Sequence, residues 1–181
     1  AGHPVVTIDY AWDAAKKMQS VTVKQTQPGR AFQLPFTIDY YVKGQVQHQA
    51  VTMTEATQTF TMALAAKPDL VNVDASKKTL WQKTDTKPMG EFAYQYAHAP
   101  TYVDRHEAVA TATKEQATSA AARGVLLAGL NDKFYGIRIA ALQALKLDDK
   151  AVAKAAAPAL RKRISAEKDP LVRSCWLRWP S

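Results

Sequence analysis

The spacing of apolar residues changes once along this 181-residue chain, and that change constrains the fold more than any other feature. From Pro4 to about Lys83, apolar residues recur at every second position, which is typical of half-buried strands. After about Gly90 the sequence is rich in alanine and the apolar spacing becomes helical. We therefore predict two domains, one all-β and the next all-α.

The first half contains several short runs with this alternation. Two sets of residues would each share one face of a strand: Val6, Ile8, Tyr10 and Trp12, and then Phe36, Ile38, Tyr40 and Val42. Turn-forming sequences separate the runs at 13–17, 27–30, 43–44 and 67–69. About seven short strands without a helical crossover predict an antiparallel, Ig-like β-sandwich over residues 1–84.

Residues 85–101 are interpreted as a linker with a first short helix that ends before Pro100. Further helices are expected over 103–116, after Ser119, over 135–147 and after Asp148. We interpret residues 102–181 as a truncated segment of HEAT-like helical repeats.

A weak repeat supports that interpretation. Arg105, Arg138 and Arg173 recur at intervals of roughly 33 to 35 residues, near the period of helical-hairpin repeats. In the HEAT pattern an Asp and an Arg bond along the stack of hairpins. Asp132 and Asp169 each precede one of these arginines, so we expect them to supply the acidic partners.

The last repeat departs from the pattern. Trp176 stands where a small residue is expected, and the sequence stops at Ser181 before the repeat is complete. The end of a solenoid without a polar cap exposes apolar surface. We therefore expect Trp176, Leu177 and Trp179 to form a surface prone to association.

The net charge of +8 raises the question of a nucleic-acid partner. Much of the excess lies near the end of the chain, in Arg161, Lys162, Arg163, Lys168, Arg173 and Arg178. A solvated helix face explains it better than a phosphate-binding surface, because no aromatic residues alternate with these cations. No apolar run approaches the ~20 residues that cross a bilayer. We expect neither a nucleic-acid partner nor a membrane.

One segment begins like a zinc-peptidase motif. His106 and Glu107 match the first half of H-E-x-x-H, but Ala110 stands where the second histidine is required. His98 is separated from His106 by Pro100, so a shared metal site would need a fortuitous bend of the chain. No metal-binding residue is predicted.

Other reactive residue types have simpler structural explanations. None of the serines considered lies in a G-x-S-x-G context: Ser119, Ser165 and Ser174. Three aspartates fall on strands of the first half, where edge or turn placement is the better interpretation than acid–base catalysis: Asp9, Asp39 and Asp74. Cys175, the single cysteine, is interpreted as an idle thiol. We predict no catalytic or cofactor-binding residue.

Four aromatic residues of the first half would suit a carbohydrate-binding groove: Trp12, Tyr40, Tyr41 and Trp81. Core packing is the preferred interpretation, because Trp12 and Tyr40 share their strand faces with isoleucine and valine.

Several segments occur in an order that resembles a known family. They are Gly2-His3-Pro4-Val5-Val6-Thr7-Ile8, Val21-Thr22-Val23-Lys24-Gln25-Thr26-Gln27, Leu34-Pro35-Phe36-Thr37-Ile38, then residues 67–74 and 102–108. Together they resemble the aminopeptidase N-like zinc metallopeptidases over nearly the whole chain. The resemblance implies a sandwich domain that follows a catalytic domain, and then the start of a helical C-terminal domain.

The family's zinc motif and its G-x-M-E-N motif lie upstream of this region, and neither occurs here. The resemblance implies a non-catalytic accessory fragment, with zinc expected only in the parent's catalytic domain. The implied partners are that upstream domain of the same chain and the parent's peptide substrate. The alternative is a non-enzymatic scaffold, because the same pair of domains occurs in relatives without peptidase activity, including a transcription-factor subunit.

Overall fold

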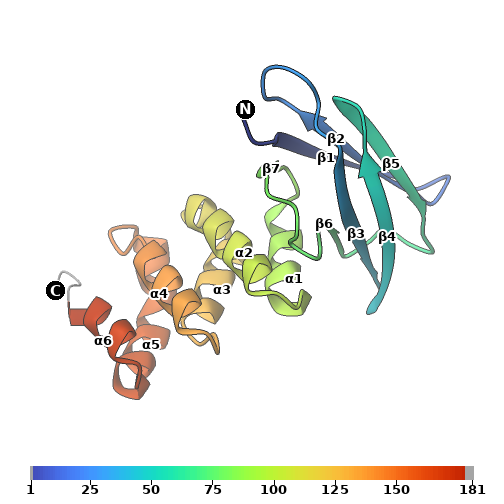
Figure 1. Cartoon of the computed structure of the whole chain (residues 1–181). Coiled ribbons are helices and arrows are strands. Elements are labelled where there is room, and N and C mark those ends of the chain that lie inside the picture. The colour runs from blue at the N-terminus through green and yellow to red at the C-terminus, as the bar shows by residue number, and fades with distance from the viewer. Residues whose placement is uncertain (1, 178–181) are drawn as a thin grey trace. The chain divides into compact units, whose positions relative to one another are not determined.

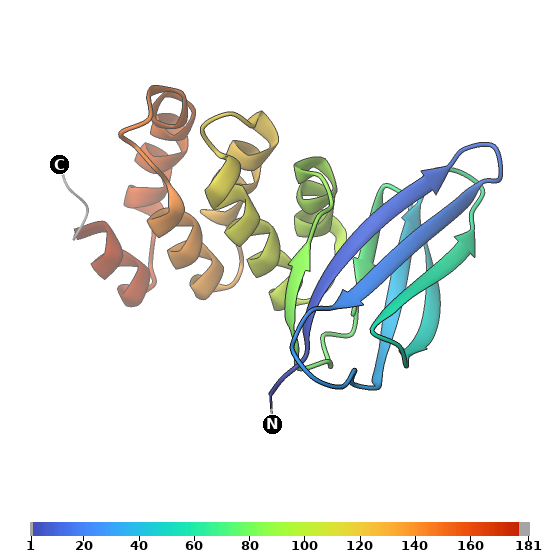
Figure 2. The same ribbon diagram turned by 90° about the horizontal axis from the view of Figure 1, so that it is seen from above.

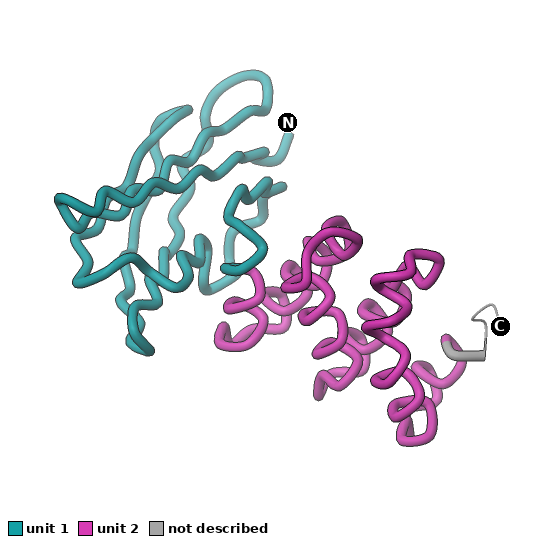
Figure 3. Tube along the Cα trace, turned by 180° about the vertical axis from the view of Figure 1, so that it is seen from behind, with its two compact units in different colours: residues 1–91 teal, residues 92–181 magenta. Residues whose placement is uncertain are grey.

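The computed structural model describes residues 2–177, apart from the side chains of Trp176 and Leu177. The chain divides into two compact units, residues 1–91 and 92–181, which Figure 3 colours separately. We call them the β unit and the helical unit. The predicted association surface of Trp176, Leu177 and Trp179 lies outside the described side chains. Within the described residues, no helix has the length and apolarity needed to cross a membrane.

The β unit contains two sheets, labelled in Figure 1. Its strands are β1 (Val5–Asp13), β2 (Met18–Gln25), β3 (Leu34–Val42), β4 (Gln45–Met53), β5 (Thr57–Ala63), β6 (Leu70–Val73) and β7 (Gln82–Asp85). One sheet has the order β5-β2-β1-β7 and the other β4-β3-β6.

Both sheets contribute to one hydrophobic core, which makes the arrangement sandwich-like. Alternate residues turn inward as the period of two predicts, so that Ile8 of β1 and Ile38 of β3 are fully buried in the same cluster. Phe36 meets Phe60 edge to face, with ring centroids 5.6 Å apart. The sequence therefore identified the inward faces of both sheets correctly.

The prediction of a purely antiparallel sandwich is wrong at one edge. Strand β7 pairs with β1 in parallel, with Gln82 opposite Val5 and Asp85 opposite Ile8. The segment Gln-Lys-Thr-Asp has no apolar residue and gives no alternating pattern. Backbone hydrogen bonds hold it in place and continue to Thr86, whose backbone amide donates to the carbonyl of Ile8 at 3.3 Å. The hydroxyl of Thr86 donates to the same carbonyl at 2.8 Å.

The tightest hairpin lies between β3 and β4 at Lys43 and Gly44. Both residues have positive φ, 49° and 78°. This is the backbone that two-residue hairpins require, and glycine adopts it without steric cost. The predicted turn at 43–44 is confirmed.

The helices are α1 (Met89–His98), α2 (Tyr102–Glu115), α3 (Ala120–Gly129), α4 (Tyr135–Ala144), α5 (Lys150–Ala166) and α6 (Pro170–Leu177). Within the helical unit, α2 packs against α3 and α4, α3 packs against α5, and α4 packs against α6. Figure 2 shows these helices side by side in chain order. We group the helices in chain order as the hairpins α1–α2, α3–α4 and α5–α6, in which α2, α4 and α6 form one row.

Local sequence explains where these helices begin. Thr101 and Asp104 form a reciprocal capping box at the start of α2. Ser119 accepts from the backbone of Ala122 at the start of α3, and Asp149 caps α5.

Helices α3 and α4 approach closely at one point. A Cβ atom added to Gly129 of α3 would lie 2.7 Å from the Cβ of Ala141 in α4. Leu126, Ile137 and Leu142 are fully buried around this contact. Small residues at the crossing therefore bring the leucine and isoleucine side chains together.

Candidate functional site

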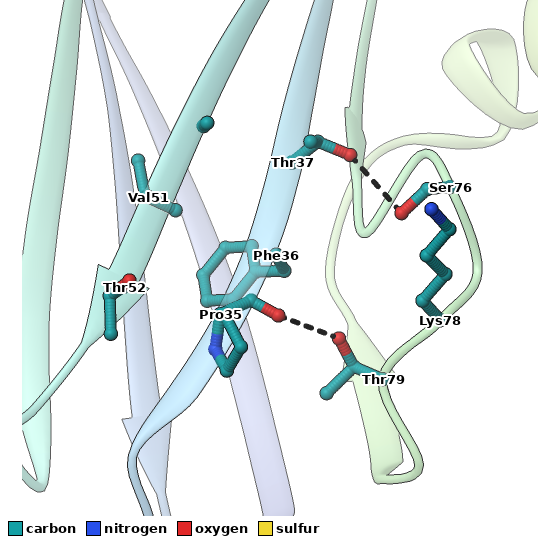
Figure 4. Close-up of a pocket in the computed structure, with 9 residues that line it drawn as sticks. Pro35, Phe36, Thr37, Val51, Thr52, Ser76, Lys78 and Thr79 are labelled. Carbon is teal, nitrogen blue, oxygen red and sulfur yellow. Dashed lines mark hydrogen bonds between the residues drawn. The ribbon is translucent and has the colours of Figure 1, made fainter.

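An open pocket of about 580 Å³ lies beside β3 and β4 in the β unit. Figure 4 shows its lining, in which strand residues face the loop after β6. The loop is fixed by two hydrogen bonds: Thr79 Oγ1 donates to the carbonyl of Pro35 at 3.3 Å, and Thr37 Oγ1 lies 3.5 Å from Ser76 Oγ.

The chemistry of this cavity is limited. Among the described residues that line it, Lys78 is the one with a titratable side chain, and the polar remainder are hydroxyls. An acid–base pair needs two titratable groups within reach of one substrate. These lining residues therefore offer surface for contact and no pair of groups for proton transfer.

A smaller cavity of about 190 Å³ in the β unit borders a buried lysine. The side chain of Lys87 is fully buried, and its Nζ lies 3.0 Å from Asp85 Oδ2 and 3.2 Å from the carbonyl oxygen of Val71. Tyr10 adds a hydroxyl that donates to Asp85 at 2.9 Å. These contacts satisfy the lysine charge and fix the segment after β7 against β1 and β6.

Glu91 lies beside the same cavity and differs from an ordinary surface glutamate. Burial raises the pKa of its carboxyl group, although the backbone amide of Val71 donates to it at 3.4 Å. Sequence reasoning missed both Lys87 and Glu91, because a buried charge has no periodic pattern when its partners are distant in the chain.

In the helical unit, charged side chains join successive hairpins. Arg105 of α2 donates through Nε to Asp132 Oδ2 at 2.8 Å, and Asp132 lies three residues before α4. Asp132 also accepts from the hydroxyl of Tyr96 at 3.0 Å and from the backbone of Phe134 at 2.8 Å. One buried carboxylate therefore joins α1, α2 and the start of α4.

The second step repeats this arrangement. Arg138 of α4 donates through Nε and Nη2 to Glu167 at 3.0 and 3.1 Å, and Arg163 adds a bond of 2.7 Å from α5. Burial alone raises the pKa of Glu167, but the bonds from Arg138, from the backbone of Asp169 and from Arg163 outweigh it and lower the pKa to about 2. We call the two steps the arginine ladder.

The ladder differs from the sequence prediction in one residue. Asp132 is the acidic partner of Arg105, as expected, but the acidic partner of Arg138 is Glu167 and not Asp169. Asp169 instead caps α6 by accepting from the backbone of Leu171 and Val172. A glutamate reaches farther than an aspartate, so a search for either acid three residues before each helix would have found both partners.

The incomplete zinc motif lies on α2 with ordinary helical contacts. The ring of His106 is exposed and lies against Tyr102, with centroids 5.7 Å apart, while Glu107 accepts from Gln95 at 3.0 Å. His98 lies against Tyr94 instead. Within residues 2–177, no group of three histidine, cysteine, aspartate or glutamate side chains is arranged to hold a metal. The residues described here do not fit a zinc ion.

The aspartates and serines considered above have separate partners. Asp39 bonds His48 at 2.7 Å on one sheet, Asp9 accepts from Thr86 on the other, and Asp74 accepts from backbone amides after β6. Ser119 caps α3, while Ser165 and Ser174 donate to carbonyls of their own helices. The structure does not bring these groups together.

The aromatic residues lie in or against the core. Tyr40 is fully buried, its hydroxyl donates to Gln49 at 2.7 Å, and burial raises its pKa to about 12. Trp12 and Trp81 pack against the same core cluster, and Tyr41 is also buried. The positions of these aromatic residues leave little aromatic surface for a carbohydrate groove.

Cys175 is half-buried, with its sulfur 4.0 Å from Gln143.

The basic residues near the end of the chain fall into two groups. Arg163 forms an ion pair with Glu167. Arg161, Lys162, Lys168 and Arg173 are exposed. Arg178 lies outside the described residues.

Comparison with known proteins gives a structural match. No protein-family model and no curated protein matches the sequence. A crystal structure of Legionella pneumophila aminopeptidase A in complex with aspartic acid matches 93% of this chain with a TM-score of 0.66 and 11% sequence identity. The chain spans 24% of that protein's length. At this identity the match shows a shared fold over nearly the whole chain.

Proposed function

We propose that this chain is a non-catalytic accessory region of a zinc-dependent aminopeptidase, which supports the catalytic domain and limits access of peptide substrates. The observation that carries the proposal is the fold match to part of an aminopeptidase over 93% of the chain. An Ig-like sandwich, HEAT-type repeats and the domain limits 1–84, 85–101 and 102–181 belong to the same proposal.

The internal contacts support a mechanical role. In the helical unit, the two ladder steps place charged hydrogen bonds between consecutive hairpins, and charge-assisted bonds of this kind are about twice as strong as neutral ones. A wall that excludes large substrates must keep its shape when a peptide presses on it. A row of hairpins joined by the arginine ladder meets that requirement.

Zinc and the catalytic residues belong, in this proposal, to the upstream domain of the parent protein. The partners are that domain and the peptide substrate it holds, and neither nucleic acid nor a membrane is among them. No step of peptide hydrolysis is assigned to a residue of this chain.

The test compares this chain with a form extended upstream through the preceding domain. Zinc content and hydrolysis of aminoacyl-anilides are measured on both. We expect zinc and activity in the extended form alone. Hydrolysis by the isolated chain would overturn the accessory role, and inactivity of both forms without zinc would favour the non-enzymatic scaffold.

A second measurement examines the role in access. In the extended form, Arg138→Gln removes donors from the second ladder step, and the substituted residue lies outside the proposed catalytic domain. We expect kcat/KM for a single aminoacyl-anilide to stay the same and selectivity between short and long peptides to fall. Lys162→Gln, an exposed residue of α5, is the matched control and should leave both unchanged.

A further inference from the structure

The edges of the two sheets in the β unit differ in how their backbone groups are protected. At the β6 edge, the amide of Val71 donates to Glu91 and its carbonyl accepts from Lys87. The β7 edge is a short strand that carries charged side chains. At the β5 edge, the side chain of Gln49 donates to the carbonyl of Thr61 at 3.3 Å. Covering side chains, short strands and charges are the devices by which proteins prevent another strand from joining a sheet.

Strand β4, which forms the remaining edge beside β3, lacks these devices (Figure 1). It is nine residues long and contains no proline, lysine, arginine, aspartate or glutamate. Its pairing with β3 is regular from Gln45 to Met53, without a bulge, and most of its side chains are exposed. A long, regular and uncharged edge of this kind is open to pairing with another strand.

The free edge of β4 presents backbone groups at alternate residues. Tyr41 and Thr37 of β3 direct their carbonyls to the amides of Asp69 and Ala75, on the β6 side. The residues of β3 between them therefore bond β4, and the residues of β4 opposite Tyr41 and Thr37 and in step with them face outward. This outward set is Val46, His48, Ala50 and Thr52. Within the described part of the chain, no group bonds the backbone amide or carbonyl of any member.

We propose that two copies of this chain form a two-fold symmetric dimer by antiparallel pairing of their β4 strands. In the register that places Gln49 opposite Gln49 of the other copy, Val46 lies opposite Thr52 and His48 opposite Ala50. Every outward amide and carbonyl then has a partner, whereas a shift of the register in either direction leaves some without one. The two three-stranded sheets become one continuous sheet.

The distribution of charge favours a second copy as the occupant of this edge. The chain has a net charge of +8, so two copies repel each other over most approaches. Strand β4 carries no lysine or arginine, and the proposed register places no like charges opposite each other. A two-fold axis also needs only one self-complementary strand. The proposal does not rest on the accessory role, because it depends on the β unit alone.

Sedimentation equilibrium of the full chain tests the proposal, and we expect a reversible dimer. Ala50→Pro removes an outward amide and no hydrogen bond to β3, so the strand can retain its place in the sheet. Each copy loses one intermolecular hydrogen bond, and the dissociation constant of the dimer should rise by about tenfold or more. Circular dichroism at low concentration verifies that the variant is folded.

A second variant does not depend on tolerance of proline. Ala50→Lys places a cation beside the two-fold axis in both copies, so it should weaken the dimer, and added salt should restore part of the affinity. Thr118→Lys, at an exposed residue of the helical unit, is the matched control and should leave dimerisation unchanged. A monomeric wild-type chain, or a dimer that neither substitution at Ala50 weakens, would overturn the proposal.

Cross-linking tests the register. In a Cys175→Ser background, Gln49→Cys places two thiols opposite each other, where Cα atoms of an antiparallel pair lie about 4.5 Å apart and a disulfide can form. Gln47→Cys is the matched control, because residue 47 lies opposite Val51 of the other copy. We expect mild oxidation to link the first variant and not the second. Equal cross-linking of the two would contradict the proposed pairing.

Discussion

The two units of this molecule depend on buried charge to different degrees. In the β unit, large aliphatic and aromatic side chains from two sheets fill one core, and Lys87 is a buried exception beside it. In the helical unit, the buried residues include many small alanines, and charged pairs join one hairpin to the next. The first unit is organised by the shapes of its side chains and the second by repeated polar contacts.

The difference follows from geometry. An aromatic core such as that of Phe36 and Phe60 packs well in one arrangement, so its shape specifies the fold. Alanine-rich helices present similar surfaces at successive turns and could slide past one another. We infer that Arg105 and Arg138 fix the register of the hairpins, a role best attested for buried polar groups in helical assemblies.

The largest expected effect tests the shape-dependent core. Ile38→Ala removes a fully buried side chain of β3 and should lower the free energy of unfolding of the β unit by about 3–4 kcal/mol. Val46→Ala on β4, where the side chain is 38% exposed, is the control and should cost below about 0.5 kcal/mol. Denaturant unfolding monitored by tryptophan fluorescence measures both. A cost near that of the control would mean that the core is not shape-specific.

The second-largest expected effect is the loss of stability of the helical unit in acid. The folded pKa of Glu167 lies near 2, below its ordinary value of 4.5, so its contribution is present above pH 4.5 and is lost as pH falls toward 2. The helical unit should lose on the order of 3 kcal/mol over that range. Helical circular dichroism at a series of pH values measures the loss, which Glu167→Gln should flatten.

The stability contributions of Glu91 and Asp74 in the β unit should change with pH in the opposite direction to that of Glu167. Burial raises the pKa of both carboxyl groups, so protonation favours the folded state and their contribution is lost as pH rises through the folded pKa. We expect a fall in pH from 4.5 toward 2 to weaken the helical unit more than the β unit. Equal acid sensitivity of the two units would contradict this difference.

The ladder itself gives the third effect. Arg138→Gln leaves a buried carboxylate with fewer donors and should cost the helical unit about 2 kcal/mol. Lys154→Gln, on the exposed surface of α5, is the control for loss of one positive charge. Thermal unfolding compares the two. Indistinguishable midpoints would show that hydrophobic packing alone sets the register.

The smallest effect concerns close approach. Gly129→Ala places a methyl group 2.7 Å from Ala141 and should cost about 1–2 kcal/mol through displacement of α4. Gly124→Ala lies in the same helix with open space around it and should be neutral or stabilising. If both substitutions stabilise the protein, α3 and α4 can move apart without cost, and the close contact between Gly129 and Ala141 is not required.

The sequence predicted those elements whose residues carry their own pattern. Alternation located β1 and β3, and capping residues such as Ser119 located helix starts. Strand β4 was not singled out, because most of its side chains are exposed and glutamines separate its few apolar residues. Strand β7 was missed because its place depends on hydrogen bonds to a distant strand and not on apolar side chains.

Some charged contacts also carry a pattern in the sequence, whereas others do not. The repeated spacing of the arginines predicted a ladder, since a repeat is visible in the sequence. Glu167 was missed because the expected acidic partner was an aspartate, and Asp169 lies near the same turn; a search for either acid three residues before each helix would have found it. The Lys87 cluster has no repeat and depends on three separate strands or loops meeting.

The parallel pairing of β7 with β1 has a consequence for synthesis on the ribosome. The hydroxyl of Thr86 bonds the carbonyl of Ile8 across 78 residues of chain, so this edge of the sheet cannot close until nearly the whole β unit has left the exit tunnel. Until then β1 exposes an unpaired backbone edge, which nascent chains on neighbouring ribosomes can pair with. The helical hairpins depend on partners nearby in the chain and can form as they emerge. A pause in translation after residue 86 has left the exit tunnel would therefore give the sheet time to close before the helical unit is complete.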